Sequence, residues 1–223
     1  FLFLPHREDS RLIALVSKAR DRVVVMFRDM SAYGIRCLEG ADPLCIERFL
    51  ELLAERGYRR IDALGRNVDL TTGAGGRYRV WRDWLDRHGI EGTFHEIPHR
   101  SFDSDDANAA EFCREKLAVG EFADAIFCFN PTLAFGLYRA CFERGIVPGR
   151  DLSVFAFGDQ EKARLMTPAL ATVKNIGVGK TIRDIVAEYC PGATRSDKLK
   201  FQLASTDIEI GESIINKNRG GAR

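Results

Sequence analysis

Four polar residues lie where predicted strands end or where the helix after a strand begins: Arg77, Asn130, Asp159 and Asn175. The carboxyl ends of parallel strands share one edge of a sheet, and ligands of α/β proteins bind at that edge. Guanidinium, amide and carboxylate groups can bond the hydroxyls or the carboxylate of a small ligand. Each residue taken singly is a common turn or helix-cap residue. Together they predict a binding site for a small polar molecule.

A glycine cluster at residues 73–76 raises the alternative of a nucleotide site. The cluster follows a predicted strand and precedes a predicted helix. A dinucleotide fingerprint that starts at Gly73 needs a third glycine at position 78, where the chain has Tyr78. The sequence also has no G-x-x-x-x-G-K-[ST] phosphate-binding motif. We therefore interpret the cluster as a flexible loop at a helix start.

The sequence carries no enzyme signature. It has no G-x-S-x-G nucleophile elbow. A metal site could be formed by His95, Glu96 and His99. However, the run H-E-I-P-H cannot act as the helical zinc motif H-E-x-x-H, because Pro98 breaks a helix there. We interpret this segment as a solvated loop. We expect no catalytic activity, no bound metal and no cofactor.

The composition is that of an ordinary globular protein and excludes several classes. Lys and Arg total 33 against 32 Asp and Glu, so little positive charge is left to neutralise phosphates, and we expect the chain not to hold nucleic acid by itself. No apolar run reaches the roughly 18 residues that a membrane span needs. The six cysteines are scattered without a C-x-x-C pair. We interpret them as buried, reduced thiols of a cytosolic protein, with disulfides or a zinc site as the less favoured alternative.

Short apolar runs alternate along the chain with longer segments of helical period. The runs predict strands at Phe1–Leu4, Val23–Phe27, Arg60–Leu64, Thr93–Ile97, Ala125–Phe129, Leu152–Phe157 and Leu170–Val173, and Lys200–Ile210 looks extended. The periodic segments predict helices at Asp9–Ala19, Pro43–Arg56, Arg77–His88, Asp105–Ala118, Pro131–Arg144 and Val178–Tyr189. This alternation predicts an α/β fold with parallel strands, right-handed crossovers and helices on both faces of the sheet.

Four segments, taken in order, match a known pattern. Residues 53–61 end in G-Y-R-R-I, residues 125–136 read A-I-F-C-F-N and end in A-F-G, residues 145–154 read G-I-V-P-G-R-D-L-S-V, and residues 167–173 read T-P-A-L-A-T-V. Their order and spacing resemble the LacI/GalR family of bacterial transcription regulators, whose segments read GHRRI, AIFAAND..A.G, G..VP.DISV and TPPLTTV. The resemblance covers almost the whole chain.

The resemblance implies two Rossmann-like, parallel-sheet lobes of the periplasmic binding protein-like type. Residues 1–64 would form part of the N-terminal lobe and residues 65–174 the C-terminal lobe. Residues 175–198 would return to the N-terminal lobe, and residues 199–223 would add a strand and a tail to the C-terminal lobe. The family's DNA-binding headpiece, hinge helix and first two strand–helix units have no counterpart in this sequence. We therefore expect the N-terminal lobe to be incomplete in this chain.

The same resemblance implies a cytoplasmic, homodimeric sensor that binds a small sugar-like or sugar-acid effector in the interlobe cleft. Effector binding would change the angle between the lobes and so modulate operator binding by an N-terminal helix-turn-helix that is absent from this chain. A periplasmic sugar-binding protein of an ABC transporter shares the fold and the cleft and is the alternative. The residues before Phe1 would discriminate between the two, and unpaired cysteines favour the cytosol.

Carried over residue by residue, the resemblance implies effector contacts at six positions: Arg77, Asn130, Asp159, Asn175, Asp42 and Phe102. Arg77 matches the family's cleft arginine, whose planar fork can bond vicinal hydroxyls or a carboxylate with two parallel hydrogen bonds. Phe102 lies near a position where the family often has a stacking aromatic residue.

The sequence departs from the family pattern at two of the segments that carry these positions. Pro131 replaces the aspartate of the "ND" pair that begins with Asn130, and Gly158 replaces the first, effector-binding aspartate of the "GFDD" segment, leaving Asp159. Segments that end in Gly-Asp occur among gluconate-type regulators. Together with Arg77, this variant indicates a sugar acid as effector.

Overall fold

The computed structural model describes residues 2–3, 10–27, 29–39, 44–66, 73–98, 104–158, 161–176, 178–202 and 205–217. The chain divides into two compact units. The larger comprises Pro43–Leu70, Ala74–Lys174 and Ile208–Arg223, and the smaller comprises Phe1–Asp42, Thr71–Gly73 and Asn175–Asp207. Each unit is built on its own β-sheet.

The larger unit is built on a six-stranded sheet in the order β10-β8-β7-β6-β4-β5. Its strands are β4 (Asp62–Gly65), β5 (Phe94–Glu96), β6 (Ala125–Cys128), β7 (Ser153–Ala156), β8 (Ala171–Ile176) and β10 (Ser205–Glu209). The pairings from β5 across β4, β6 and β7 to β8 are all parallel. The helices of this unit are α2 (Leu44–Glu55), α3 (Gly73–His88), α4 (Asp105–Ala118), α5 (Pro131–Glu143) and the short α6 (Glu161–Leu165).

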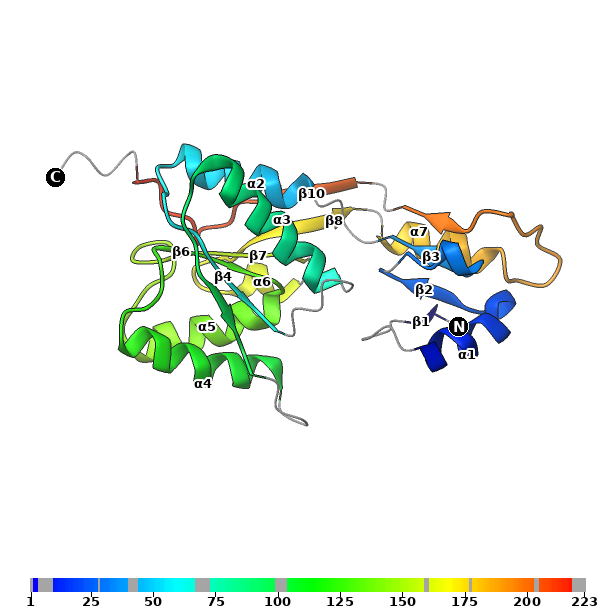
Figure 1. Ribbon diagram of the computed structural model, residues 1–223, viewed down its shortest axis with the longest axis horizontal. Coiled ribbons are helices and arrows are strands. Elements are labelled where there is room, and N and C mark those ends of the chain that lie inside the picture. Colours follow the sequence, from blue (N-terminus) through cyan, green and yellow to red (C-terminus); the bar gives the residue numbers. More distant parts are fainter. Residues whose placement is uncertain are drawn as a thin grey trace. The chain divides into compact units, whose positions relative to one another are not determined.

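Helices cover both faces of this sheet, with α2 and α3 on one side and α4 and α5 on the other (Figure 1). Successive side chains of a strand point to opposite faces. On β6, Ile126 and Cys128 therefore join the core cluster beneath α4 and α5, whereas Phe127 stacks on Phe155 of β7. Phe155 in turn stacks on Phe49 of α2 at 3.5 Å between ring centroids. Strands buried on both faces explain the unbroken apolar runs in the sequence.

The close approach of α4 and α5 depends on a glycine. A Cβ atom added to Gly136 of α5 would lie 2.4 Å from the carbonyl oxygen of Asp106 and 2.6 Å from the Cβ of Ala109, both on α4. Such distances are far inside van der Waals contact, so only glycine fits between the two backbones.

The smaller unit is built on a four-stranded parallel sheet in the order β1-β2-β3-β9. Its strands are β1 (Leu2–Phe3), β2 (Val24–Met26), β3 (Arg36–Leu38) and β9 (Lys200–Phe201), and its helices are α1 (Ser10–Lys18) and α7 (Val178–Ala187). One core cluster joins Val16 of α1 to Val25 and Cys37 on one sheet face. A second joins Ile185 of α7 to residues of β2, β3 and β9 on the other.

The predicted α/β fold with parallel sheets is confirmed, and most elements appear within a few residues of their expected bounds. Strand β3 and helix α6 were not anticipated, and the extended stretch Lys200–Ile210 is divided into β9 and β10. Helix α3 starts at Gly73, so the glycine cluster lies in its first turn and not in a loop before it.

The lobe boundary expected at residue 64 differs from the compact units. Helix α2 and strand β4 belong to the larger unit, because β4 pairs with both β5 and β6 in the six-stranded sheet.

Candidate functional site

Arg77 lies in the first turns of α3, at the carboxyl edge of the larger sheet, and is half-buried. Its Nη1 donates a hydrogen bond of 2.8 Å to the carbonyl oxygen of Phe129. Its guanidinium lies 4.4 Å from the centroid of the Phe157 ring, within cation–π distance. Phe129 directly follows β6 and Phe157 directly follows β7, so Arg77 spans the ends of two neighbouring strands.

The charge of Arg77 is not neutralised by any carboxylate in the part of the chain that the structure describes. Desolvation by the surrounding protein lowers the pKa of this guanidinium to about 10, and no nearby acid raises it. A desolvated cation without a counter-ion is unfavourable by itself. The arrangement is suited to an anionic or strongly hydrogen-bonding ligand that supplies the missing acceptors.

Asn130 caps helix α5 and stands beside the same strand end. Its Oδ1 accepts a hydrogen bond of 3.0 Å from the backbone N–H of Leu133, and Pro131 occupies the first helical position. The cap uses the amide oxygen only, and the Nδ2 group has no hydrogen-bond acceptor among the described residues. Asn130 therefore serves the helix and still presents a donor at the strand end.

The two departures from the family pattern meet in space. Gly158 has φ +129°, a conformation open to glycine but strained for other residues, and a Cβ added there would lie 3.2 Å from Cδ of Pro131. The two positions that carry aspartates in the family pattern are therefore close neighbours in space. The aspartates themselves would have placed negative charge near the Arg77 end of β6 and β7.

Arg77 and Asn130 are neighbours at the end of β6, because Arg77 hydrogen-bonds the carbonyl oxygen of Phe129, the residue before Asn130. The side chains of the other four candidates are not described by the structure. Asn175 belongs to strand β8, although its side chain is outside what the structure describes. Asp42, Phe102 and Asp159 also lie outside the described residues. Effector contacts at all six positions stay a prediction.

Sequence reasoning missed the parts played by Phe129 and Phe157, which it treated only as strand residues. The usable signal was position, because each is the last apolar residue of a buried run, with a polar residue one position later (Asn130) or two positions later (Asp159) in the sequence. Phe129 provides a backbone acceptor for the guanidinium of Arg77, and Phe157 provides a ring for it.

The interpretation of residues around His95 as a solvated loop is wrong. His95 lies on β5, is 6% exposed, and its Nε2 hydrogen-bonds Oδ2 of Asp62 at 3.0 Å. The Asp62 carboxylate, itself fully buried, also accepts from the backbone N–H groups of Thr93 and Ala123 at 2.9 and 2.8 Å. His95 therefore fastens β5 to β4 in the core.

The sequence predicts neither a metal site nor a membrane-spanning helix, and the two statements that follow concern the described residues alone. There, no group of three or more His, Cys, Asp or Glu residues is arranged to hold a metal ion. None of the helices found there is both long and apolar enough to cross a membrane. The six cysteines are free thiols; five of them are buried, as predicted, whereas Cys190 is exposed, contrary to the prediction.

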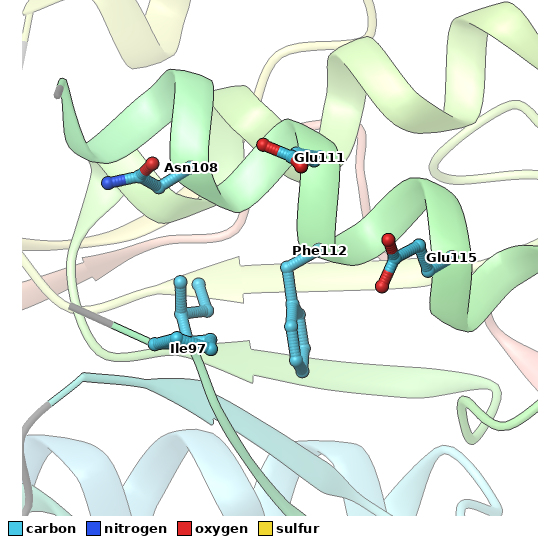
Figure 2. Close-up of a pocket in the computed structure, with 6 residues that line it drawn as sticks. Ile97, Asn108, Glu111, Phe112 and Glu115 are labelled. Carbon is cyan, nitrogen blue, oxygen red and sulfur yellow. The ribbon is translucent and has the colours of Figure 1, made fainter. Parts of the chain in front are cut away.

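A separate small cavity lies beside α4 and is lined by Ile97, Pro98, Asn108, Glu111, Phe112 and Glu115. Phe112 extends from α4 alongside Ile97 (Figure 2). The cavity volume of about 60 Å³ is well below the roughly 300 Å³ at which ligand pockets begin. It has room for water, and none of the six candidate residues lines it.

Comparison with known proteins places these features in a family. A family model described as a periplasmic binding protein-like domain matches residues 50–187. The chain is similar to the HTH-type transcriptional repressor PurR of Vibrio atlanticus (strain LGP32), with 30% identity over 138 residues, 61% of this chain and 40% of the relative. It is also similar to the lactose operon repressor of Rhizobium radiobacter, with 38% identity over 79 residues, 34% of this chain and 69% of the relative.

Solved structures show the same fold. A sugar-binding transcriptional regulator of the LacI family from Escherichia coli, complexed with phosphate, superimposes with a TM-score of 0.69 at 22% identity, over 96% of this chain and 76% of that one. At this identity the likeness concerns the fold alone. The aligned part of the chain spans less than half the length of the PurR relative.

Proposed function

Because the chain belongs to the periplasmic binding protein-like family, in the form found in LacI-family transcriptional regulators, we propose that it is the ligand-sensing and dimerisation module of such a regulator. Its effector is a small sugar-like molecule or sugar acid, bound in the interlobe cleft that the resemblance implies. Effector binding modulates operator binding by a separate N-terminal helix-turn-helix, in a cytoplasmic protein.

The observation that carries the proposal is the guanidinium of Arg77, which no carboxylate among the described residues neutralises. It is fixed by Phe129 and Phe157 at the carboxyl edge of a parallel sheet, where α/β proteins bind ligands. A carboxylate can bond it with two parallel charge-assisted hydrogen bonds. Neutral hydroxyls can do the same more weakly, so an acidic ligand gains the larger benefit from this site.

The relatives favour a regulator over the binding component of a transporter, because the PurR and lactose operon relatives are both named as repressors. The balanced charge of the chain agrees with this assignment, since 33 basic against 32 acidic residues leave DNA contact to another domain. The effector can shift operator affinity only by binding more tightly to one of two conformational states.

The proposed dimer has a plausible contact surface on α5. Almost every residue of this helix is buried except a stripe that includes Phe135, Arg139 and Phe142, and Phe142 is 78% exposed. Aromatic residues are enriched in protein interfaces, which is the reason to place the dimer contact on this stripe. A two-fold axis at this stripe would cover Phe142 in both copies.

Calorimetric titration with D-glucose, D-glucuronate and D-gluconate tests the effector proposal. We expect an acidic probe to bind, and Arg77→Met to weaken that binding at least about tenfold, since a charge-assisted pair is lost. The matched control is Arg82→Met, because Arg82 lies on the same helix, is partly exposed and is paired with Asp86. Binding that is equal in the wild type and in Arg77→Met would contradict the assignment of Arg77.

The melting temperatures of the same variants show whether each one is folded. Arg77→Met loses the hydrogen bond to Phe129 and the contact with the Phe157 ring but no ion pair with a described carboxylate, so ligand-free Arg77→Met should melt within a few degrees of the Arg82→Met control. A loss of binding with an unchanged melting temperature then reports on the site itself.

A further inference from the structure

The small cavity beside α4 lies within the larger unit, next to the residues that follow β5 (Figure 2). Its lining consists of Ile97, Pro98, Asn108, Glu111, Phe112 and Glu115. The cavity volume of about 60 Å³ is too small for a sugar ring, but it is several times the roughly 10–15 Å³ that one water molecule requires. The cavity therefore has room for a ligand of about four heavy atoms.

One buried amide in this lining has no partner. Asn108 of α4 is only 6% exposed, and its Nδ2 group makes no hydrogen bond within the part of the chain that the structure describes. A buried polar group without a hydrogen bond is unfavourable, so this amide points to a partner that the protein itself does not supply. A half-turn of the amide exchanges Nδ2 with Oδ1, and a hydroxyl group suits either orientation because it can both accept and donate.

Two carboxylates continue the same row of side chains. Figure 2 shows Asn108, Glu111 and Glu115 in succession along α4, and both glutamates are exposed. Residues four positions apart on a helix are neighbours, and like charges at this spacing repel each other. The adjacent Lys116 is engaged elsewhere, because its Nζ pairs with Oε2 of Glu121 at 2.5 Å. A cationic group between Glu111 and Glu115 is therefore attracted to both.

Apolar side chains form the rest of the wall. Ile97 is 1% exposed, and Phe112 is partly buried against the core of the larger unit. The methylene groups of a ligand gain free energy when they leave water for such a wall. The lining thus combines an amide, two carboxylates and an apolar surface, which complement a hydroxyl, an ammonium group and a short carbon chain.

We propose that this cavity binds a short amino alcohol in its protonated form, as a second ligand site that is separate from the effector site. The ammonium group lies between Glu111 and Glu115, the methylene groups lie against Ile97 and Phe112, and the hydroxyl hydrogen-bonds the amide of Asn108. This site does not depend on the sensor function proposed above, because none of the proposed effector residues lines the cavity.

Three probes with four heavy atoms each test the proposal on the full 223-residue chain at neutral pH and constant ionic strength: ethanolamine, n-propylamine and 1-propanol. The second has a methyl group in place of the hydroxyl, and the third has no charge. Titrations followed in ¹H–¹⁵N NMR spectra detect the millimolar affinity expected of so small a ligand. We expect n-propylamine to bind about fivefold more weakly than ethanolamine, since one hydrogen bond is lost, and 1-propanol not to saturate the site.

Two substitutions separate the polar contacts. In Asn108→Leu, ethanolamine and n-propylamine should bind equally, because the amide that distinguishes them is gone. In Glu115→Gln, the Kd of both amines should rise about threefold, as expected for the loss of an exposed ion pair. The matched control is Glu51→Gln, since Glu51 is an exposed glutamate on α2 of the same unit, and it should change neither Kd.

Thermal melting shows whether the variants are folded. Asn108→Leu should melt within a few degrees of the wild type, because its Nδ2 group makes no hydrogen bond that the variant can lose. Asn108→Ala gives the same comparison of the two amines if the leucine variant does not fold.

The outcomes decide between this site and simpler readings of the cavity. Absence of saturable binding by ethanolamine overturns the proposal. It is also overturned if 1-propanol binds as tightly as ethanolamine, which would show a merely apolar cavity, or if n-propylamine does so in the wild type, which would show that the amide plays no part. An unchanged Kd in Glu115→Gln overturns the assignment of the carboxylates. None of these results bears on Arg77, which the sugar probes test separately.

Discussion

Replacement of Asp62 by alanine should cause the largest loss of stability of any single carboxylate in the described core. Asp62 is fully buried at the start of β4 and accepts hydrogen bonds from His95 of β5 and from the backbone N–H groups of Thr93 and Ala123. Arg60 lies 3.2 Å away as well. One side chain thus joins two strands to the loop that precedes β6.

The magnitude follows from what the substitution leaves behind. Two backbone N–H groups lose their acceptor, and each unpaired buried donor costs about 1–3 kcal/mol. His95 and Arg60 lose their carboxylate partner as well, which brings the total cost to roughly 3–5 kcal/mol. We expect Asp62→Ala to lower the free energy of unfolding by about 3–5 kcal/mol. Asp62→Asn, which retains one carbonyl oxygen, should cost about half as much.

The same group predicts a pH dependence. Burial alone would raise the pKa of Asp62, but hydrogen bonds from His95 and from the N–H groups of Thr93 and Ala123 outweigh it and lower the pKa. A carboxyl with a depressed folded pKa contributes stability that is present above its unfolded pKa of about 3.9 and is lost as the pH falls through the folded value. Wild-type stability should therefore fall below about pH 4 more steeply than that of Asp62→Asn.

Urea unfolding followed by circular dichroism measures these differences. Asp86→Ala is the control, because Asp86 is exposed and its pair with Arg82 is of the surface i, i+4 type, which contributes less than about 1 kcal/mol. If Asp62→Ala unfolds within about 1 kcal/mol of this control, the carboxylate does not hold the strands together as described. Equal pH profiles for the wild type and Asp62→Asn would refute the electrostatic part alone.

Four other substitutions should act through separate features. Gly136→Ala should lower the free energy of unfolding by about 1–3 kcal/mol, because its Cβ would lie 2.4 Å from the Asp106 carbonyl oxygen, whereas Gly76→Ala on open helix surface should raise it by about 0.5–1 kcal/mol; urea titrations compare the two. Phe142→Asp should dissociate the proposed dimer, as sedimentation velocity at micromolar concentration would show. Pro131→Asp should weaken an acidic probe about fivefold in calorimetry and leave D-glucose unaffected, since it returns a carboxylate to the Arg77 edge.

The fold could be predicted from the sequence where the burial of an element determines its pattern of apolar residues. Strands such as β6 read A-I-F-C because both faces are covered, and α4 has the bounds expected from its period and its acidic first turn. Strand β3 was missed because it contains Arg36, which is 3% exposed and paired with Glu188. A charged residue buried by a distant partner cannot be recognised from local alternation.

The sequence predicted which positions belong to the candidate site, but not the contacts that their side chains make. The rule about carboxyl ends located Arg77 and Asn130, but it could not say that Asn130 also caps α5 or that Phe157 supports the guanidinium. Such contacts join strands separated by crossovers, and a single sequence does not encode their distances in any short pattern. His95 was misjudged for the same reason, because its partner Asp62 is 33 positions away.

Two neighbouring positions near Arg77 lack the carboxylates that the family pattern has there. Pro131 and Gly158 replace two aspartates of the family pattern, and the two positions are close in space, since a Cβ added at 158 would lie 3.2 Å from Cδ of Pro131. A carboxylate about 4 Å from a guanidinium contributes about 4 kcal/mol at an effective dielectric constant of 20, so its removal leaves the cation strongly unsatisfied. A neutral sugar cannot replace that charge, but a sugar acid can. The loss of both aspartates therefore supports the acidic effector proposed above.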